Sequence, residues 1–220
     1  MQAGAQPVTD AFERIKEFVR TSHTETRTFP ELIHKKVLEQ EILKKLREDI
    51  KLLLDENKAD IERIRNITKG TNRISNLLSI GAHPRYLVAQ LKSIGTAINE
   101  EITKYSVIAA TLVSIIEEAR FKPRPLGHML IFAEDINSGL IEAQELCKKL
   151  IDVIPNKERA DKELKELAID IERKVVRCLN SAASFQNNVA LLMQIIQNNM
   201  NKISKEIYGL SLTSTRAGNA

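Results

Sequence analysis

The side chains in this sequence that could bind a metal are few and scattered. Its four histidines lie in separate segments, and none has a second histidine or a cysteine at the spacing of a metal-binding motif; they are His23, His34, His83 and His128. The His-Glu-x-x-His pattern of zinc proteases is absent. We therefore expect no metal site, and we expect each histidine to lie at the surface or at a helix end.

The common signatures of phosphate binding and nucleophilic catalysis are missing as well. Thr68 to Thr71 reads Thr-Lys-Gly-Thr, which lacks the glycine spacing of a phosphate-binding loop and lies inside a helical pattern. The sequence has no Gly-x-Ser-x-Gly nucleophile motif. We expect no cofactor, no small-molecule substrate and no enzymatic activity.

One acidic residue stands where an apolar residue is expected. Residues 84–119 carry an apolar seam with alternating spacings of three and four, and Glu101 is its only charged member. This position predicts partial burial and an unusual partner. Either Glu101 pairs with a lysine at a helix bend or layer edge, or it is a buried acid used in catalysis or gating. We can assign no second carboxylate to it.

The two cysteines indicate a reducing compartment. Cys147 and Cys178 are too few for a disulfide framework, and we expect no disulfide between them. The first residues lack a basic region followed by an apolar run, and the longest apolar run, residues 105–116, is shorter than the roughly 20 residues of a membrane-spanning helix. We expect a cytoplasmic protein, although a leaderless secreted protein would show the same features.

Charge is mixed along the chain. The formal net charge is +4, and basic and acidic residues are interleaved, as on solvated helix faces. No segment has the density of basic residues that is typical of a nucleic-acid-binding tail. We therefore expect no nucleic-acid partner.

Five apolar-periodic segments must position all of these side chains. Thr28 and Glu31 form a capping box before the second segment, Gly81 and Pro84 separate the second from the third, and Gly209 is predicted to end the last. Residues 1–7 and 209–220 are predicted to be flexible. The predicted helices cover residues 8–20, 30–80, 84–119, 126–154 and 157–208.

Long seams joined by short connections predict an all-α fold. We expect an elongated antiparallel up-and-down bundle of four long helices, preceded by a short amphipathic helix, in a single domain over residues 8–208. The second and last helices are longer than the other two. The bundle should therefore continue as a two-helix extension, or as a three-helix one if the first helix folds over it.

The most unusual stretch runs from Cys178 to Asn201 and contains no Asp, Glu, Lys or Arg. An exposed helix face would ordinarily carry Lys and Glu, whereas uncharged amides tolerate partial burial. This face is expected to be covered by the first helix of the same chain, or by a second copy or partner protein; insertion into a bilayer is a third alternative. The candidate interaction surface consists of Phe185, Asn188, Leu191, Gln194, Ile195 and Asn198.

Two other segments are candidate binding elements. The predicted turn near residue 122 carries a basic tip around an aromatic residue, formed by Arg120, Phe121, Lys122 and Arg124. It is either a stiff, solubilising connector or a contact for an anionic membrane or acidic partner. The predicted first helix has an apolar side that contains Phe12, Ile15, Phe18 and Val19.

These patterns lead to two function hypotheses. The first is a non-enzymatic interaction or scaffold protein that acts through long coiled-coil-like helices and binds a protein partner or forms a homodimer. The second is a membrane-acting bundle, of a lipid-binding, remodelling or pore-forming type, in which the first helix detaches and binds an anionic membrane. An enzyme is a distant third, and bundle folds by themselves dictate no function.

Overall fold

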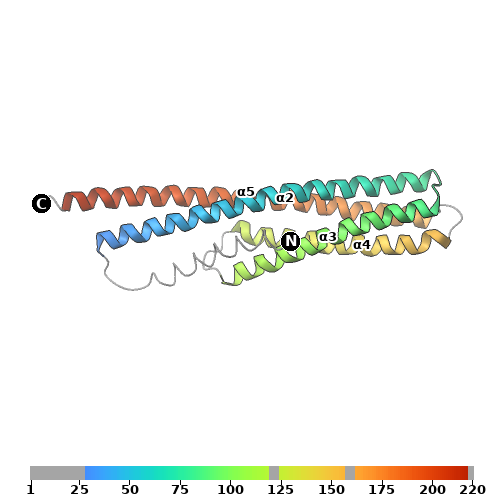
Figure 1. Cartoon of the computed structure of the whole chain (residues 1–220), viewed down its shortest axis with the longest axis horizontal. Helices are drawn as coiled ribbons and strands as arrows, with labels where there is room; N and C mark the ends of the chain where they lie inside the picture. Colours follow the sequence, from blue (N-terminus) through green and yellow to red (C-terminus); the bar gives the residue numbers. More distant parts are fainter. Residues whose placement is uncertain (1–27, 119–123, 157–161, 218–220) are drawn as a thin grey trace. The chain divides into compact units, whose positions relative to one another are not determined.

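The computed structural model describes residues 28–118, 124–156 and 162–217, and these residues are almost entirely helical (Figure 1). They form four long α-helices and one short 3-10 turn, and they contain no strand. The all-α prediction is confirmed. The predicted helix over residues 8–20 lies outside the described residues. The elements are α2 (Phe29–Ser79), α3 (Pro84–Glu118), α4 (Arg124–Val153), η1 (Ile154–Asn156) and α5 (Lys162–Ala217).

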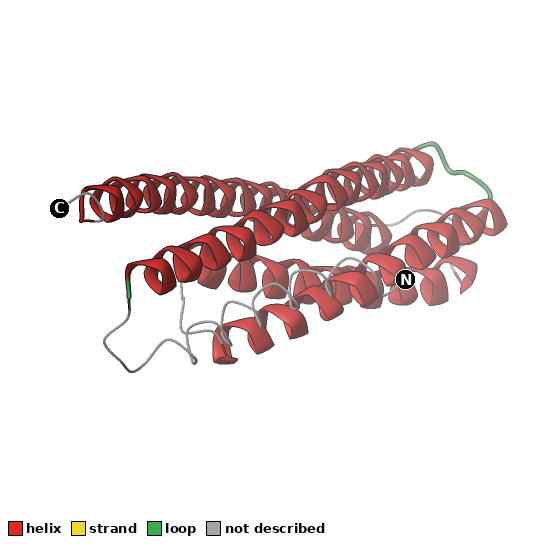
Figure 2. Cartoon of the chain, turned by 60° about the vertical axis from the view of Figure 1, so that its left-hand side comes forward, coloured by secondary structure: helices red, strands yellow, loops and turns green. Residues whose placement is uncertain are grey.

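The predicted start of α2 and the predicted turn after it are confirmed. The backbone N–H of Thr28 donates to Glu31 Oε2 at 2.8 Å, which is one half of a capping box. At the other end, Gly81 has a φ of 69°. The N–H of Ala82 donates to Leu77 O at 2.9 Å. This is the left-handed glycine cap that ends many helices, and it precedes the short loop drawn in green that leads to α3 (Figure 2).

Two of the described helix boundaries differ from the prediction by more than one residue. α4 begins at Arg124, two residues early, because a proline in the first turn of a helix loses no hydrogen bond, so Pro125 fits there. α5 continues past Gly209 to Ala217. Among the described glycines only Gly81 has a positive φ, so Gly209 stays helical. Glycine inside a helix costs about 1 kcal/mol relative to alanine, which weakens a helix without ending it.

The contacts of the chain divide it into two compact units, and the single domain stays a prediction. Unit 2 consists of residues 56–110 and 128–187 and contains a stretch of each long helix. Neighbouring helices in it run antiparallel. On one side of α4, Gln144 Nε2 donates to Asn99 Oδ1 of α3 at 3.1 Å. On the other side, Lys174 of α5 pairs with Glu142. Unit 2 is thus an antiparallel four-helix bundle, as predicted.

The core of unit 2 follows the apolar seams of its four helices. Its fully buried members include Ile64 on α2, Ile98 on α3, Ile136 on α4 and Val175 on α5. α4 and α5 approach closely at Gly139, where an added Cβ would lie 2.6 Å from Cys178 Sγ. A larger residue at this position would force the Cys178 side chain or the two helices to shift.

Unit 1 is built mainly from α2 and α5, the two helices predicted to form the extension. Its described residues are 28–55, 111–118, 124–127 and 188–217. α2 and α5 run antiparallel here: Lys36 Nζ lies 2.7 Å from Glu206 Oε2, and Gln40 Nε2 donates to Ser204 Oγ at 2.6 Å. Their buried apolar residues, among the described side chains, are Leu43, Leu46, Ile50, Val189, Leu192, Ile196 and Ile203.

Candidate functional site

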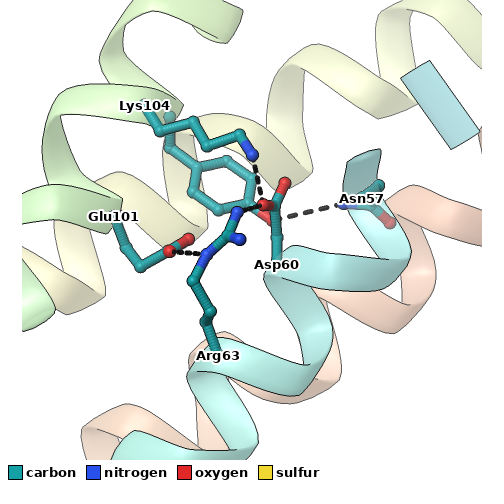
Figure 3. A network of polar contacts seen from close by, with 6 residues as sticks. Asn57, Asp60, Arg63, Glu101 and Lys104 are labelled. Carbon is teal, nitrogen blue, oxygen red and sulfur yellow. Dashed lines mark hydrogen bonds and ion pairs between the residues drawn. The ribbon is translucent and has the colours of Figure 1, made fainter. Parts of the chain in front are cut away.

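Glu101 is buried in unit 2, as its seam position predicted, with 2% of its surface exposed. Its carboxylate accepts a hydrogen bond from Arg63 Nε of α2 (Figure 3). The partner is therefore an arginine, where the sequence analysis suggested a lysine. Burial raises the pKa of Glu101, although the hydrogen bond and charge of Arg63 act in the opposite direction.

A second buried carboxylate lies beside the first. Asp60 of α2 is 1% exposed and accepts hydrogen bonds from both Arg63 and Lys104. Figure 3 shows the Arg63 side chain between the carboxylates of Glu101 and Asp60. The two carboxylates and the two cations balance in formal charge. The sequence analysis missed Asp60, and the available signal was that Asn57, Asp60 and Ile64 continue the helical spacing of the α2 seam.

The polar network formed by Asn57, Asp60, Arg63, Glu101 and Lys104 (Figure 3) borders an aromatic pair. Asn57 Nδ2 donates to the hydroxyl of Tyr105 at 3.2 Å, and both residues are buried. The Tyr105 ring packs edge-on against Phe185 of α5, with centroids 6.4 Å apart and an interplanar angle of 87°. Phe185 is fully buried in this contact. Phe185 was predicted to belong to the candidate interaction surface; it lies instead in the core, because the inward seam of α5 passes through residue 185.

The network is not fully satisfied. Within the described part of the chain, Asn57 Oδ1, Asp60 Oδ2 and Glu101 Oε2 are buried and have no hydrogen-bond partner. An unsatisfied buried polar group costs about 1–3 kcal/mol. Apolar side chains of similar volume would often hold α2 and α3 together at least as strongly. The pairs that join the two helices favour one register, since sliding α2 along α3 would separate Glu101 from Arg63 and Asp60 from Lys104, whereas the Asp60–Arg63 pair lies within α2.

The two cysteines are buried and do not have the features of reactive thiols. Cys147 and Cys178 are both buried free thiols. Burial raises the pKa of each to about 12. Cys178 Sγ lies 3.6 Å from the carbonyl oxygen of Ile136. A thiol reacts as its thiolate, so neither side chain has the exposed, acidified form of a reactive cysteine.

The neutral stretch of α5 is partly exposed in unit 1. Asn188 is 9% exposed and Ile195 is half-buried, so these two predicted surface residues belong to the packed side. Leu191, Gln194 and Asn198 are exposed. The exposed positions continue toward the C-terminus with spacings that alternate between three and four. We call this row the α5 stripe; it consists of Leu191, Gln194, Asn198, Asn201, Lys205, Tyr208 and Leu212.

The remaining predicted residues have varied outcomes. Arg124 is exposed in the first turn of α4, whereas the other three residues of the basic tip lie outside the described residues. The apolar side of the predicted first helix also lies outside them. His34 and His83 are exposed, and the N–H of Arg85 donates to His83 Nδ1 at 3.2 Å at the start of α3. In the described ranges, no group of three or more His, Cys, Asp and Glu could hold a metal ion.

None of the described helices combines the length and apolar character that a membrane crossing requires. Comparison of the chain with known protein families, with curated proteins and with solved structures gives no match.

Proposed function

We propose that this protein is a non-enzymatic helical interaction module whose binding surface is the α5 stripe of unit 1. The observation that supports this proposal most is the character of the stripe. It has no charge from Leu191 to Asn201, and its large apolar side chains are exposed: Leu191 by 50%, Tyr208 by 68% and Leu212 by 48%. The apolar side chains lie toward the two ends of the row with uncharged amides between them, and amides cost less to bury against a partner than charged side chains do.

The spacing supports the same proposal. Alternating steps of three and four place one row of side chains along a helix, which is the seam that meets a partner helix in a coiled coil. α5 already uses its inward row in unit 1, through Leu192, Ile196 and Ile203. The stripe is a second row on the same helix, and its side chains remain exposed.

The exposed positions of α5 in unit 2 can be compared with those of the stripe in unit 1. In unit 2 the exposed positions carry mainly charged side chains, including Lys165, Glu166, Arg173 and Arg177. This is the usual composition of a solvated helix face. The uncharged run begins at Cys178, inside unit 2, and continues to Asn201 in unit 1, so the loss of charge is confined to one part of the helix. The polar amides in the stripe favour a reversible interface over an obligate one, because obligate interfaces are more hydrophobic.

Site-specific photo-cross-linking in cells that express the full chain tests this proposal. A benzophenone amino acid replaces Gln194 or Asn198 in the stripe, and the matched control replaces Arg177, which is exposed on the same helix in unit 2. We expect adducts of higher mass from residues 194 and 198 and none from residue 177. Cross-links only within the chain, or equal adducts at the stripe and at the control, would overturn the proposal.

A further inference from the structure

We infer that the α5 stripe binds the α5 stripe of a second copy of this chain, with the two helices antiparallel and related by a two-fold axis between residues 199 and 200. This inference rests on the proposed function and names its partner. In an antiparallel coiled coil, the alternating positions of one stripe face those of the other, so the residue numbers in a layer have a constant sum. In the inferred register, residue 191 faces 208, residue 194 faces 205 and residue 198 faces 201. The two-fold axis repeats each of these three layers once.

The layers pair side chains that complement each other. The outermost layer places Leu191 against the ring of Tyr208 of the second copy. Next, the carbonyl oxygen of Gln194 faces the ammonium group of Lys205 of the second copy, an acceptor opposite a donor. The central layers place Asn198 against Asn201 of the second copy. Six of the seven stripe residues thus meet a matching partner, while Leu212 faces Asn187 of the second copy, which lies outside the stripe.

The amides of the central layers suit a two-fold interface. A charged side chain near the axis would lie close to the same charged side chain of the second copy and repel it, whereas an amide both donates and accepts. Asn201 Oδ1 already accepts a hydrogen bond from Gln197 Nε2 at 3.0 Å on the same helix. The Asn201 amide nitrogen is therefore the donor that would reach the Asn198 carbonyl oxygen across the interface.

Other arrangements of two copies are less complementary. A parallel, in-register pair would place Lys205 against Lys205, a repulsive contact. An antiparallel pair displaced by seven residues would place Leu191 against Asn201 in one direction, or Tyr208 against Asn198 in the other. Only the inferred register pairs Leu191 with Tyr208. Its layers extend over residues 191–208, about 25 Å of helix, and their polar centre predicts a weak, reversible dimer.

Disulfide trapping between two single-cysteine variants, Gln194→Cys and Lys205→Cys, tests the register. Both positions are exposed, so neither change should unfold the chain, and circular dichroism checks this. The buried native cysteines stay in place, and the wild-type chain provides the background. Under mild oxidation we expect covalent dimer in the mixture of the two variants and only background in either variant alone.

Each single-cysteine variant oxidised on its own is a control for the mixture. In the inferred dimer, like positions 194 and 194, or 205 and 205, lie 11 residues apart along the paired helices, about 16 Å. A disulfide requires Cα atoms within about 7 Å. Covalent dimer in either variant alone, at the level of the mixture, would overturn the inference, and so would background levels in all samples together with a monomeric mass at every concentration.

The two proposals fail in distinguishable ways. Photo-adducts with a different protein at residues 194 and 198, combined with a purified chain that stays monomeric, would overturn the second copy as partner and leave the interaction surface in place. The absence of any stripe-specific adduct would overturn both. Photo-adducts of twice the chain mass, together with the mixed-variant disulfide, would support both.

Discussion

Unit 2 and unit 1 use the same kind of long helix in different ways. Unit 2 turns its apolar seams inward in a four-helix core and holds a charged network inside it. Unit 1 has fewer buried residues in its described part. Both units expose some apolar side chains, such as Ile131 in unit 2 and Leu191 in unit 1, but the exposed row of α5 in unit 1 carries no charge from Leu191 to Asn201. The buried charged residues of unit 2 therefore pair α2 with α3 inside the fold, while an uncharged face of α5 in unit 1 remains exposed.

The two units also differ in their ion pairs. Asp60 and Glu101 of unit 2 are almost fully buried, with 1% and 2% of their surfaces exposed. In unit 1, the side chains of Lys36 and Glu206 remain 31% and 36% exposed. Solvent screens the Lys36–Glu206 pair, so it contributes little to stability. Removing a cation of the unit 2 network, by contrast, leaves a buried carboxylate without its partner. Four predictions test these differences, in order of decreasing effect.

Phe185→Ala should have the largest effect, because it removes a fully buried ring from the core of unit 2. Phenylalanine-to-alanine changes in cores cost about 3–5 kcal/mol. Leu191→Ala, from the same predicted surface but half exposed in unit 1, should change the free energy of unfolding by less than about 0.5 kcal/mol. Urea unfolding of both variants measures this contrast, and equal losses would remove the distinction between the two residues.

Arg63→Met should destabilise the chain by about 3 kcal/mol, since it leaves Glu101 buried without a cation. We place the loss at the lower end of the usual range because Arg63 itself is partly exposed and Lys104 still pairs with Asp60. Adding Glu101→Gln to this variant should recover part of the loss. The matched change in unit 1, Lys36→Met, should cost no more than about 1 kcal/mol.

Urea unfolding also measures these variants. If Arg63→Met were as mild as Lys36→Met, then the buried network would contribute no more than an exposed ion pair.

The free energy of unfolding should depend on pH in part through the titration of Glu101. Burial raises its pKa above the ordinary value of 4.5, so just above pH 4.5 the folded chain holds a proton that the unfolded chain has released. The stability contributed by this group is complete below pH 4.5 and declines as the pH rises through the folded pKa. Glu101→Gln should remove this decline. Parallel pH profiles for the wild-type and Glu101→Gln chains, measured by urea unfolding, would contradict the prediction.

Substitutions at Gln194 should have the smallest effect on folding and opposite effects on self-association. Gln194→Lys places a second ammonium group opposite Lys205 in the inferred dimer and should weaken it, whereas Gln194→Glu should strengthen it. Each layer occurs twice, and a surface charge pair contributes about 0.2–1 kcal/mol, so the dimerisation constant should change severalfold at low salt. Sedimentation equilibrium measures the constant, and shifts in the same direction for both variants would count against the inferred register.

The helix pattern was largely predictable from the sequence because helix boundaries depend on local chemistry. The Thr28–Glu31 cap, the Gly81 turn and the antiparallel four-helix arrangement of unit 2 were all predicted and confirmed. Gly209 was predicted to end α5 and does not. A glycine ends a helix only when its backbone adopts a left-handed conformation, and that choice depends on the residues that follow and on packing.

The candidate sites were less predictable, because their membership depends on which helix faces which. The periodicity of α3 predicted the burial of Glu101, but Asp60 belongs to another helix and its role depends on the pairing of α2 with α3. Phe185 and Leu191 lie six residues apart in the same neutral run, yet one is in the core and the other is half exposed. A six-residue step turns a helix by about 240°, so the two side chains point to different sides.

The sequence by itself determined that the chain forms long amphipathic helices, where most of them begin and end, and that one stretch of the last helix lacks charge, since these properties depend on residues near each other in the chain. The tertiary structure decided which carboxylates and cations meet across α2 and α3, and which side of the neutral stretch remains exposed. Both of these features follow from the rotation and register of the packed helices. Rotation and register are set by contacts between residues that are far apart in the sequence.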